Sequence, residues 1–273
     1  MNDLSPYLEQ QLQHLEAEAL RRRLVPLVQS GRGYIEVAGK SCLNLSGNDY
    51  LGIGTNQELS EQFYRGMGPE NVLTGFGLTA SASRLMTGNS PLYERLETKL
   101  AALYGTERAL VFNSGYHGNV GILPVLAGKG DLILADKLCH ASLIDGMRLS
   151  RARTIRYRHL DYQHLEEILL RNRGRYDRVF IVTESIFSMD GDRADLSVLI
   201  ELKKRYQCTL YLDEAHSVGV LGQQGLGLAE QEGVIQEIDL LFGTFGKAMA
   251  GLGSFLVCTA PVADFLINQA RPL

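Results

Sequence analysis

From residue 91 to the end, the chain alternates between two hydrophobic patterns. Apolar residues that recur every three or four positions predict helices, and short apolar runs between them predict strands. The expected helices cover residues 91–105, 116–128, 140–150, 162–172 and 195–206, and another begins at Pro261. The expected strands cover residues 108–112, 131–136, 153–157, 178–185, 209–216, 238–245 and 254–259. This alternation is typical of an α/β fold, with a mainly parallel sheet flanked by helices.

The residues before 91 follow a different pattern. Leucines at helical spacing in residues 4–23 predict an amphipathic helix that ends in three arginines, and short strands are expected at 34–37 and 42–46. Residues 66–90 are rich in Gly, Ser and Thr, which predicts a loop.

We therefore expect an N-terminal helix with short strands over residues 1–47 and a large domain over residues 48–273. The hydrophobic content of 45% is ample for a large core. A net charge of -4 gives no reason to expect a nucleic-acid partner, and no apolar run approaches the ~20 residues that span a bilayer. The four cysteines form no CxxC pair, so no metal site is expected, and scattered thiols favour the cytoplasm.

Polar residues follow the predicted strands directly. Ligands in open α/β sheets bind beyond the carboxyl ends of the strands, so these residues are candidates for a shared site. In chain order, they are Gly115, His140, Ser188, Asp213, His216, Thr244 and Lys247.

An aldehyde cofactor would explain this set. Only a lysine supplies the amine for a Schiff base, and Lys247 is placed for it. Pyridoxal phosphate (PLP) also needs a carboxylate beside its ring nitrogen, which Asp213 can supply. Its phosphate needs backbone N–H groups at a helix start, such as residues 114–116, and His140 or Tyr116 could stack on its ring.

Each residue alone has a simpler explanation. A single Asp after a strand often caps a helix, and a single Lys after Gly is usually solvated. The joint placement at strand ends favours the site. The GTFGKA stretch at 243–248 lacks the spacing of a P-loop, and the arginines of residues 148–158 could attract a nucleotide but more simply form a solvated face.

Eight motifs together resemble the α-oxoamine synthase family of fold-type-I PLP enzymes. They are LRRR at 20–23, SGNDYLG at 46–52, SRLMTGN at 83–89, NSGY at 113–116, HASLIDG at 140–146, TESIFSMDGD at 183–192, LDEAHSVGVLG at 212–222 and TFGKAMAGLG at 244–253. The resemblance runs from the N-terminal helix to the last residue.

The resemblance implies roles for the residues around the cofactor ring. Lys247 would form the Schiff base and later move the substrate α-proton. Asp213 would pair with the ring nitrogen, and His216 would hydrogen-bond the ring hydroxyl. His140 would stack on the ring, and Ser188 would lie beside it.

Further roles concern the phosphate and the substrates. By resemblance, Gly115, Tyr116 and Thr244 would hold the phosphate, while Asn48 and an arginine of the 21–23 run, taken as Arg21, would face the substrates. The family condenses an amino acid with an acyl-CoA, releases CO2 and works as a homodimer. By resemblance only, the LRRR and NSGY motifs favour alanine and a pimeloyl thioester as substrates, in biotin biosynthesis, and the substrates of other family members remain alternatives.

The resemblance also implies a small C-terminal domain, with an arginine for the substrate carboxylate. The sequence ends at Leu273, so by this resemblance we expect that domain to be missing from the chain. A cofactor-binding fragment without catalysis is therefore an alternative to an active enzyme.

Overall fold

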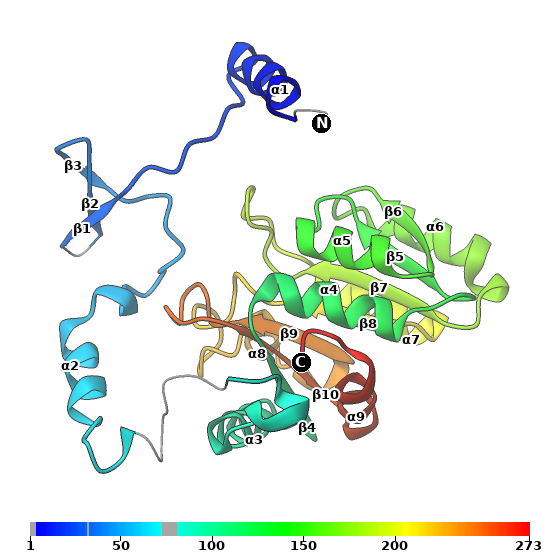
Figure 1. Ribbon diagram of the computed structural model, residues 1–273. Coiled ribbons are helices and arrows are strands. Elements are labelled where there is room, and N and C mark those ends of the chain that lie inside the picture. Colours follow the sequence, from blue (N-terminus) through cyan, green and yellow to red (C-terminus); the bar gives the residue numbers. More distant parts are fainter. Residues whose placement is uncertain (1–3, 32, 73–80) are drawn as a thin grey trace. The chain divides into compact units, whose positions relative to one another are not determined.

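The structure is a computed structural model that describes residues 4–31, 33–72 and 81–273 (Figure 1). It divides into two compact units, Met1–Ser46 and Gly47–Leu273. The predicted loop at 66–90 includes residues 73–80, and for those residues the prediction lies outside the described part of the chain.

The first unit contains a helix and a three-stranded antiparallel sheet. Its elements are α1 (Ser5–Ala17), β1 (Val28–Gly31), β2 (Tyr34–Val37) and β3 (Lys40–Leu43). The predicted end of the helix at arginines 21–23 is wrong, because α1 ends at Ala17. Ala19 has a φ of 55°, in the left-handed region, and the N–H of Leu20 donates to the carbonyl of Leu15 at 2.8 Å. This turn ends the helix before the arginine run begins.

The second unit contains the predicted α/β domain. Its helices are α2 (Gln57–Arg65), α3 (Pro91–Tyr104), α4 (Gly115–Leu126), α5 (Ala141–Leu149), α6 (Tyr162–Asn172), α7 (Leu196–Tyr206), α8 (Leu228–Gln231) and α9 (Ala260–Gln269). Its strands are β4 (Arg108–Phe112), β5 (Leu132–Asp136), β6 (Arg153–Tyr157), β7 (Val179–Glu184), β8 (Thr209–Asp213), β9 (Leu240–Thr244) and β10 (Ser254–Cys258). Short helical turns lie at Ile53–Thr55, Arg84–Gly88, Arg173–Arg175 and Ile235–Glu237. Among the residues that the structure describes, no helix is both long and apolar enough to span a membrane.

The seven strands form one sheet in the order β4-β10-β9-β8-β7-β5-β6. Strand β10 pairs antiparallel with both of its neighbours, while the pairs from β9 to β6 are parallel. The prediction of a mainly parallel sheet is confirmed. The carboxyl ends of β5, β7, β8 and β9 therefore meet at one edge of the sheet, which is where the candidate site lies.

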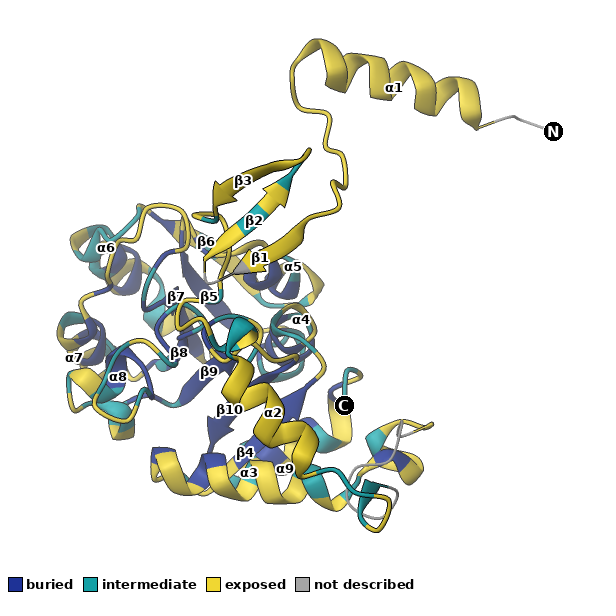
Figure 2. Ribbon diagram, turned by 90° about the vertical axis from the view of Figure 1, so that its left-hand side faces the viewer, coloured by how far each residue is buried: buried dark blue, intermediate teal, exposed yellow. Residues whose placement is uncertain are grey.

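Both faces of the sheet are covered, as strands that are apolar on both sides require. On β8, Leu210 and Leu212 pack into a core with residues of α3, α6, α7 and α8. Tyr211 points the other way, into a core with residues of α4, α5 and α9. Figure 2 shows the buried strands between α6, α7 and α8 on one side and α4 and α5 on the other.

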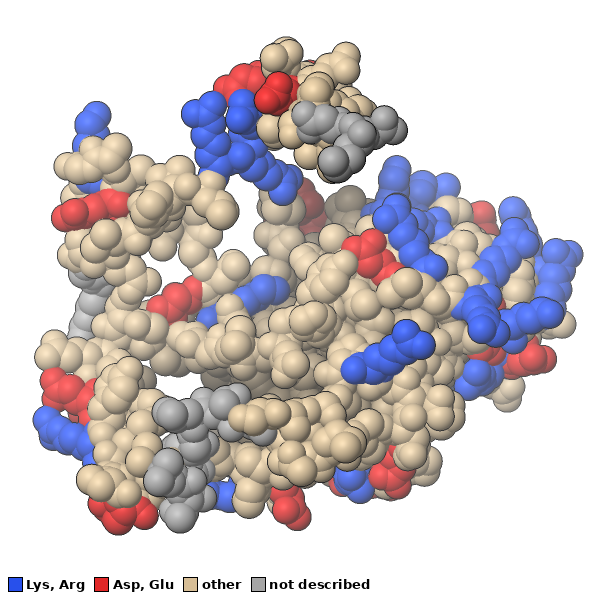
Figure 3. All heavy atoms as spheres, viewed as in Figure 1, with Lys and Arg blue, Asp and Glu red and all other residues tan. Residues whose placement is uncertain are grey.

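Lys and Arg side chains gather over the region of α5, β6 and α6 on the face seen in Figure 3. Several arginines of residues 148–158 have local partners there. Arg148 lies 3.2 Å from Asp145, and Arg158 lies 2.7 Å from Asp161. This arrangement is consistent with the solvated, ion-paired face that the sequence pattern favours.

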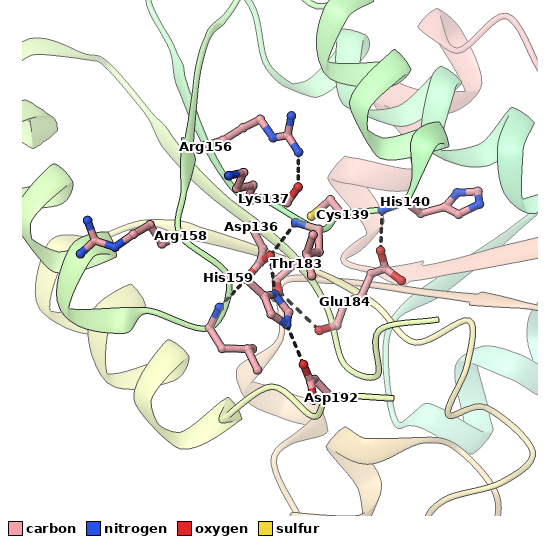
Figure 4. Close-up of polar contacts among 12 residues, drawn as sticks. Asp136, Lys137, Cys139, His140, Arg156, Arg158, His159, Thr183, Glu184 and Asp192 are labelled. Carbon is pink, nitrogen blue, oxygen red and sulfur yellow. Dashed lines mark hydrogen bonds and ion pairs between the residues drawn. The ribbon is translucent and has the colours of Figure 1, made fainter. Parts of the chain in front are cut away.

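His159, which follows β6, makes polar contacts with Asp136 at the end of β5 and with Asp192 after β7 (Figure 4). His159, after β6, places Nδ1 2.8 Å from Oδ1 of the buried Asp136 at the end of β5. Its Nε2 lies 3.1 Å from Oδ2 of Asp192, after β7. Its ring packs edge-on against Phe187 with the ring centroids 4.5 Å apart. Burial lowers the pKa of His159, but the hydrogen bonds and charges of the two carboxylates outweigh burial, so the net shift is upward.

We predict that this histidine makes stability depend on pH. Because its pKa is raised in the folded state, its contribution is fully present below the unfolded value of 6.5 and is lost as the pH rises through the folded value. Replacing His159 by Gln should lower the free energy of unfolding by about 1–2 kcal/mol at pH 6, and by less at pH 9. Urea unfolding at both pH values measures this difference. An equal loss of unfolding free energy at the two pH values would show that the charge of His159 contributes nothing to stability.

Candidate active site

A cavity of about 200 Å³ lies at the carboxyl ends of the parallel strands. Seven of the ten predicted site residues line it: Asn48, Gly115, Tyr116, His140, Asp213, Thr244 and Lys247. The amine and the carboxylate on which the prediction depends therefore face the same space.

A larger cavity, of about 690 Å³, lies beside Arg84, His117 and Arg271. None of the predicted site residues lines it, and the guanidinium of Arg84 is already bound to Glu97 at 2.6 Å. We place the candidate site in the smaller cavity because Lys247, Asp213 and His140 all line it.

Lys247 is held by a hydrogen-bonded chain. Its Nζ lies 2.7 Å from Nε2 of His216, and Nδ1 of the same ring lies 2.8 Å from the hydroxyl of Tyr50. That hydroxyl donates to Oδ1 of Asn48 at 3.2 Å. Burial, followed by the charges of Lys247 and His140, lowers the pKa of His216 to about 4. The imidazole is therefore neutral at pH 7, and its Nε2 can accept a hydrogen bond from the amine.

The lysine amine is itself shifted toward the neutral form. Burial lowers the pKa of Lys247, and the negative charges of Asp213 and Glu184 oppose that shift without reversing it. A neutral amine is the nucleophile that attacks an aldehyde, so the direction of the shift favours Schiff-base formation.

Asp213 ends β8 and is 4% exposed. Its Oδ1 accepts from the N–H of Ala215 at 2.9 Å, and its Oδ2 accepts from the side-chain amide of Asn119 at 2.9 Å. Burial raises the pKa of Asp213, while the Asn119 hydrogen bond and the Lys247 charge lower it. The carboxylate thus has one fixed donor on each oxygen and room for a further partner in the cavity.

A second carboxyl group stands next to it. Glu184 ends β7 and pairs with Asp213 across the parallel register. It accepts the backbone N–H of His140 at 2.5 Å (Figure 4). Burial and then the charge of Asp213 raise the pKa of Glu184 to about 8. Near neutral pH, the raised pKa of Glu184 therefore favours its protonated form.

Another part of the cavity lining comes from a helix start and a strand end. Helix α4 begins at Gly115, after Ser114 caps it by accepting from the N–H of His117 at 3.1 Å. The first N–H groups of a helix have no partner inside the helix and can bind an anion. Thr244 lies beside Gly115, and its Oγ1 accepts from the N–H of Gly246 at 3.1 Å.

Two further predicted residues face the cavity from helix starts. His140 caps α5, and its Nδ1 lies 2.8 Å from Oγ of Ser142. Tyr116 lines the cavity, and its hydroxyl donates to Oδ2 of Asp145 at 2.8 Å.

One prediction within the Gly47–Leu273 unit is not brought to this site. Ser188 is exposed in the segment after β7 and does not line the cavity. Arg21 belongs to the Met1–Ser46 unit, where its Nη1 lies 3.2 Å from Oε2 of Glu16. The roles assigned to both residues stay predictions.

The sequence interpretation missed three residues of the site. Glu184 ends the apolar run VFIVTE, so its position matches that of Asp213 and was a usable signal. Asn119 lies inside a helix and Tyr50 inside a turn segment, and nothing in their local patterns indicates a polar partner 94 or 166 residues away.

The side chains present fit PLP. An amine with a lowered pKa, a buried carboxylate and a helix start line one cavity, and these groups match the aldehyde, the ring nitrogen and the phosphate of the cofactor.

Comparisons with known proteins agree with this chemistry. The family model for aminotransferase class I and II matches residues 40–273. A Pasteurella multocida protein, provisionally named 8-amino-7-oxononanoate synthase, is 51% identical over 268 residues, which are 98% of this chain and 68% of that protein.

Two solved structures resemble the chain. A serine palmitoyltransferase variant from S. paucimobilis, solved with bound PLP and myriocin, is 29% identical with a TM-score of 0.85, and the match covers 100% of this chain and 70% of that one. The 8-amino-7-oxononanoate synthase of Francisella tularensis is 29% identical with a TM-score of 0.65, over 83% of this chain and 64% of that one. The chain spans about two thirds of the length of these relatives. It belongs to the aminotransferase class I and II family of PLP-dependent enzymes, as a relative of its α-oxoamine synthases.

Proposed function

We propose that this chain condenses L-alanine with pimeloyl-CoA and gives 8-amino-7-oxononanoate, CoA and CO2, a step of biotin biosynthesis. The observation that carries the proposal is the meeting of the Lys247 amine and the Asp213 carboxylate in one cavity of a chain 51% identical to a protein provisionally named for this product.

In this proposal, the chain's own residues bind the cofactor and move protons. PLP, when bound, withdraws the electrons released at the α-carbon of the amino acid. Lys247 holds the cofactor through Nζ and, once displaced by the amino acid, removes and returns the α-proton. Asp213 keeps the ring nitrogen protonated, and His216 accepts a hydrogen bond from the amine or donates to the ring hydroxyl. His140 stacks on the ring, and Ser188 lies beside it.

The substrates and the phosphate occupy the remaining positions. The N–H groups of Gly115 and Tyr116 and the hydroxyl of Thr244 bind the phosphate. Asn48 and Arg21 face the substrates, and an arginine suits the free carboxylate of a pimeloyl thioester. We further propose that the chain acts as a homodimer, and its cytoplasmic location stays a prediction.

Turnover assays separate the candidates. Purified protein loaded with PLP should release CoA and form 8-amino-7-oxononanoate, detected by mass spectrometry, from alanine and pimeloyl-CoA. Glycine with acetyl-CoA, and serine with palmitoyl-CoA, are the matched comparisons. A preference of about tenfold or more in kcat/KM for alanine and pimeloyl-CoA is expected, because the pimeloyl carboxylate adds a charged contact.

Other outcomes have defined meanings. Faster turnover of another pair assigns the chain to a related synthase. Bound cofactor with no turnover of any pair leaves a PLP-binding chain without this activity, and the proposed reaction is then rejected.

A further inference from the structure

Asn119 has every polar hydrogen-bonding group engaged inside the protein. The residue is 2% exposed on α4. Its Nδ2 donates to Oδ2 of Asp213 at 2.9 Å and to Oγ of Ser142 at 3.0 Å. Its Oδ1 accepts from the hydroxyl of Tyr211 at 2.6 Å. Because an ionised carboxylate only accepts and Tyr211 donates, the orientation of the amide is fixed by its neighbours.

Close packing brings this amide to the sheet. A Cβ added to Gly118 would lie 2.5 Å from the ring of Phe242, so α4 approaches β9 more closely than a larger residue would permit. A Cβ added to Gly146 on α5 would lie 2.5 Å from the backbone carbonyl of Asn119. The two glycines therefore let Asn119 reach across from the helix layer to the end of β8.

The amide acts on Asp213 in two ways. Burial disfavours the charged carboxylate, and the Asn119 hydrogen bond is the strongest of the contacts that oppose this effect. The same bond occupies Oδ2 from the side of α4, while Ala215 occupies Oδ1. Burial and the charge of Asp213 raise the pKa of Tyr211 well above its usual value, so its hydroxyl remains a donor to Asn119.

The amide also reaches His140. Because Ser142 Oγ accepts from Asn119, its own hydrogen is free to point at Nδ1 of His140, 2.8 Å away. That nitrogen also accepts from the backbone N–H of Ser142 at 3.2 Å. Nδ1 is therefore an acceptor, and the ring proton of neutral His140 lies on Nε2.

We propose that Asn119 is a positioning residue, which with Tyr211 and Ser142 aims the Asp213 carboxyl group at the cofactor ring nitrogen and fixes the tautomer of His140. The inference rests on the proposed function, because it needs the cofactor bound between Lys247 and Asp213. It adds a residue that acts through Asp213 and His140.

A cofactor analogue tests this role without turnover. In a deaza analogue of PLP, carbon replaces the ring nitrogen, while the aldehyde and the phosphate are kept. Both compounds form the same bond to Lys247, so that contribution cancels in the ratio of their dissociation constants. The wild-type protein should bind PLP more tightly than the analogue. Asn119→Leu and Tyr211→Phe should reduce this preference about tenfold and severalfold respectively, because a hydrogen bond to a charged group is lost or loosened.

A matched variant controls for lost packing. Tyr104 is a buried tyrosine whose hydroxyl donates to the carbonyl of Leu226 at 2.9 Å, away from the cavity. Tyr104→Phe removes a similar buried hydrogen bond and should leave the PLP preference unchanged. Circular dichroism checks that each variant is folded, and Tyr211→Phe decides the question if Asn119→Leu does not fold.

The outcomes distinguish the inference from the proposed function. If the wild type prefers PLP and the folded variants keep the full preference, Asn119 is structural and the inference is wrong. If the wild type binds both compounds equally, Asp213 does not pair with the ring nitrogen, and the proposed role of Asp213 fails together with the inference.

Discussion

Lys247→Ala should abolish the covalent attachment of the cofactor and lower turnover about 10³-fold or more, because Lys247 is the only lysine among the described residues that line the cavity. Borohydride reduction followed by peptide mass spectrometry measures the attachment directly, since it converts the Schiff base to a stable amine. In the wild type, the added mass should lie on the peptide that contains Lys247. In the variant, that mass should be missing.

Two controls make the result specific. Lys247→Arg keeps a positive charge beside Asp213 but supplies no amine for a Schiff base, so it should also lose the attachment. Lys204→Ala removes an exposed lysine that pairs with Glu237 at 2.8 Å, and it should keep both attachment and turnover. Attachment that persists in Lys247→Ala would contradict the assignment of this lysine and the function built on it.

Much of this site could be predicted because of how parallel sheets are built. The alternation of helices and strands places the carboxyl ends of β8 and β9 at one edge. Asp213 and the segment with Lys247 follow those ends, so their meeting in one cavity needs no knowledge of the loops. A short apolar strand that ends at a charged residue therefore predicts, from local sequence alone, where that residue lies in the fold.

The contacts that hold these residues could not be predicted in the same way. Tyr50 meets His216, and Asn119 meets Asp213, through packing between segments far apart in the chain. The local sequence predicts a turn around Tyr50 and a helix around Asn119. Neither hydrophobic periodicity nor secondary-structure propensity indicates which buried group a polar side chain will hydrogen-bond. The end of α1 was missed for a related reason, because a left-handed Ala19 overrides the helical spacing of the leucines.

Arg84 shows how a residue of one of the eight sequence motifs can serve the fold. It belongs to the SRLMTGN motif, and its Nη1 and Nη2 lie 2.6 and 3.0 Å from the carboxylate of Glu97 on α3. Nη1 also donates to the carbonyl of Val111, and Glu97 accepts the N–H of Val111 at 2.8 Å. Val111 lies on the edge strand β4, so the ion pair satisfies backbone groups that an edge strand otherwise leaves open.

We expect Arg84→Met to lower the free energy of unfolding by about 3 kcal/mol or more, because it leaves the Glu97 carboxylate largely buried without its partner. The two side chains are 17% and 15% exposed, so water screens this pair weakly. Urea unfolding measures the loss. Replacing Glu97 by Leu in the same chain should recover part of it, because the double variant no longer buries an unpaired charge.

Arg65→Met is the matched control, since it breaks an ion pair with Glu61 in which the side chains are 78% and 46% exposed. A pair so accessible to water should contribute about 0.5 kcal/mol or less. If Arg84→Met lowers the free energy of unfolding by no more than Arg65→Met does, the buried ion pair does not stabilise the β4 edge. A large loss of unfolding free energy in Arg84→Met, with partial recovery in the double variant, would show that the unpaired Glu97 carboxylate causes the loss. Packing lost around the guanidinium could not explain the recovery, because it is missing in both variants.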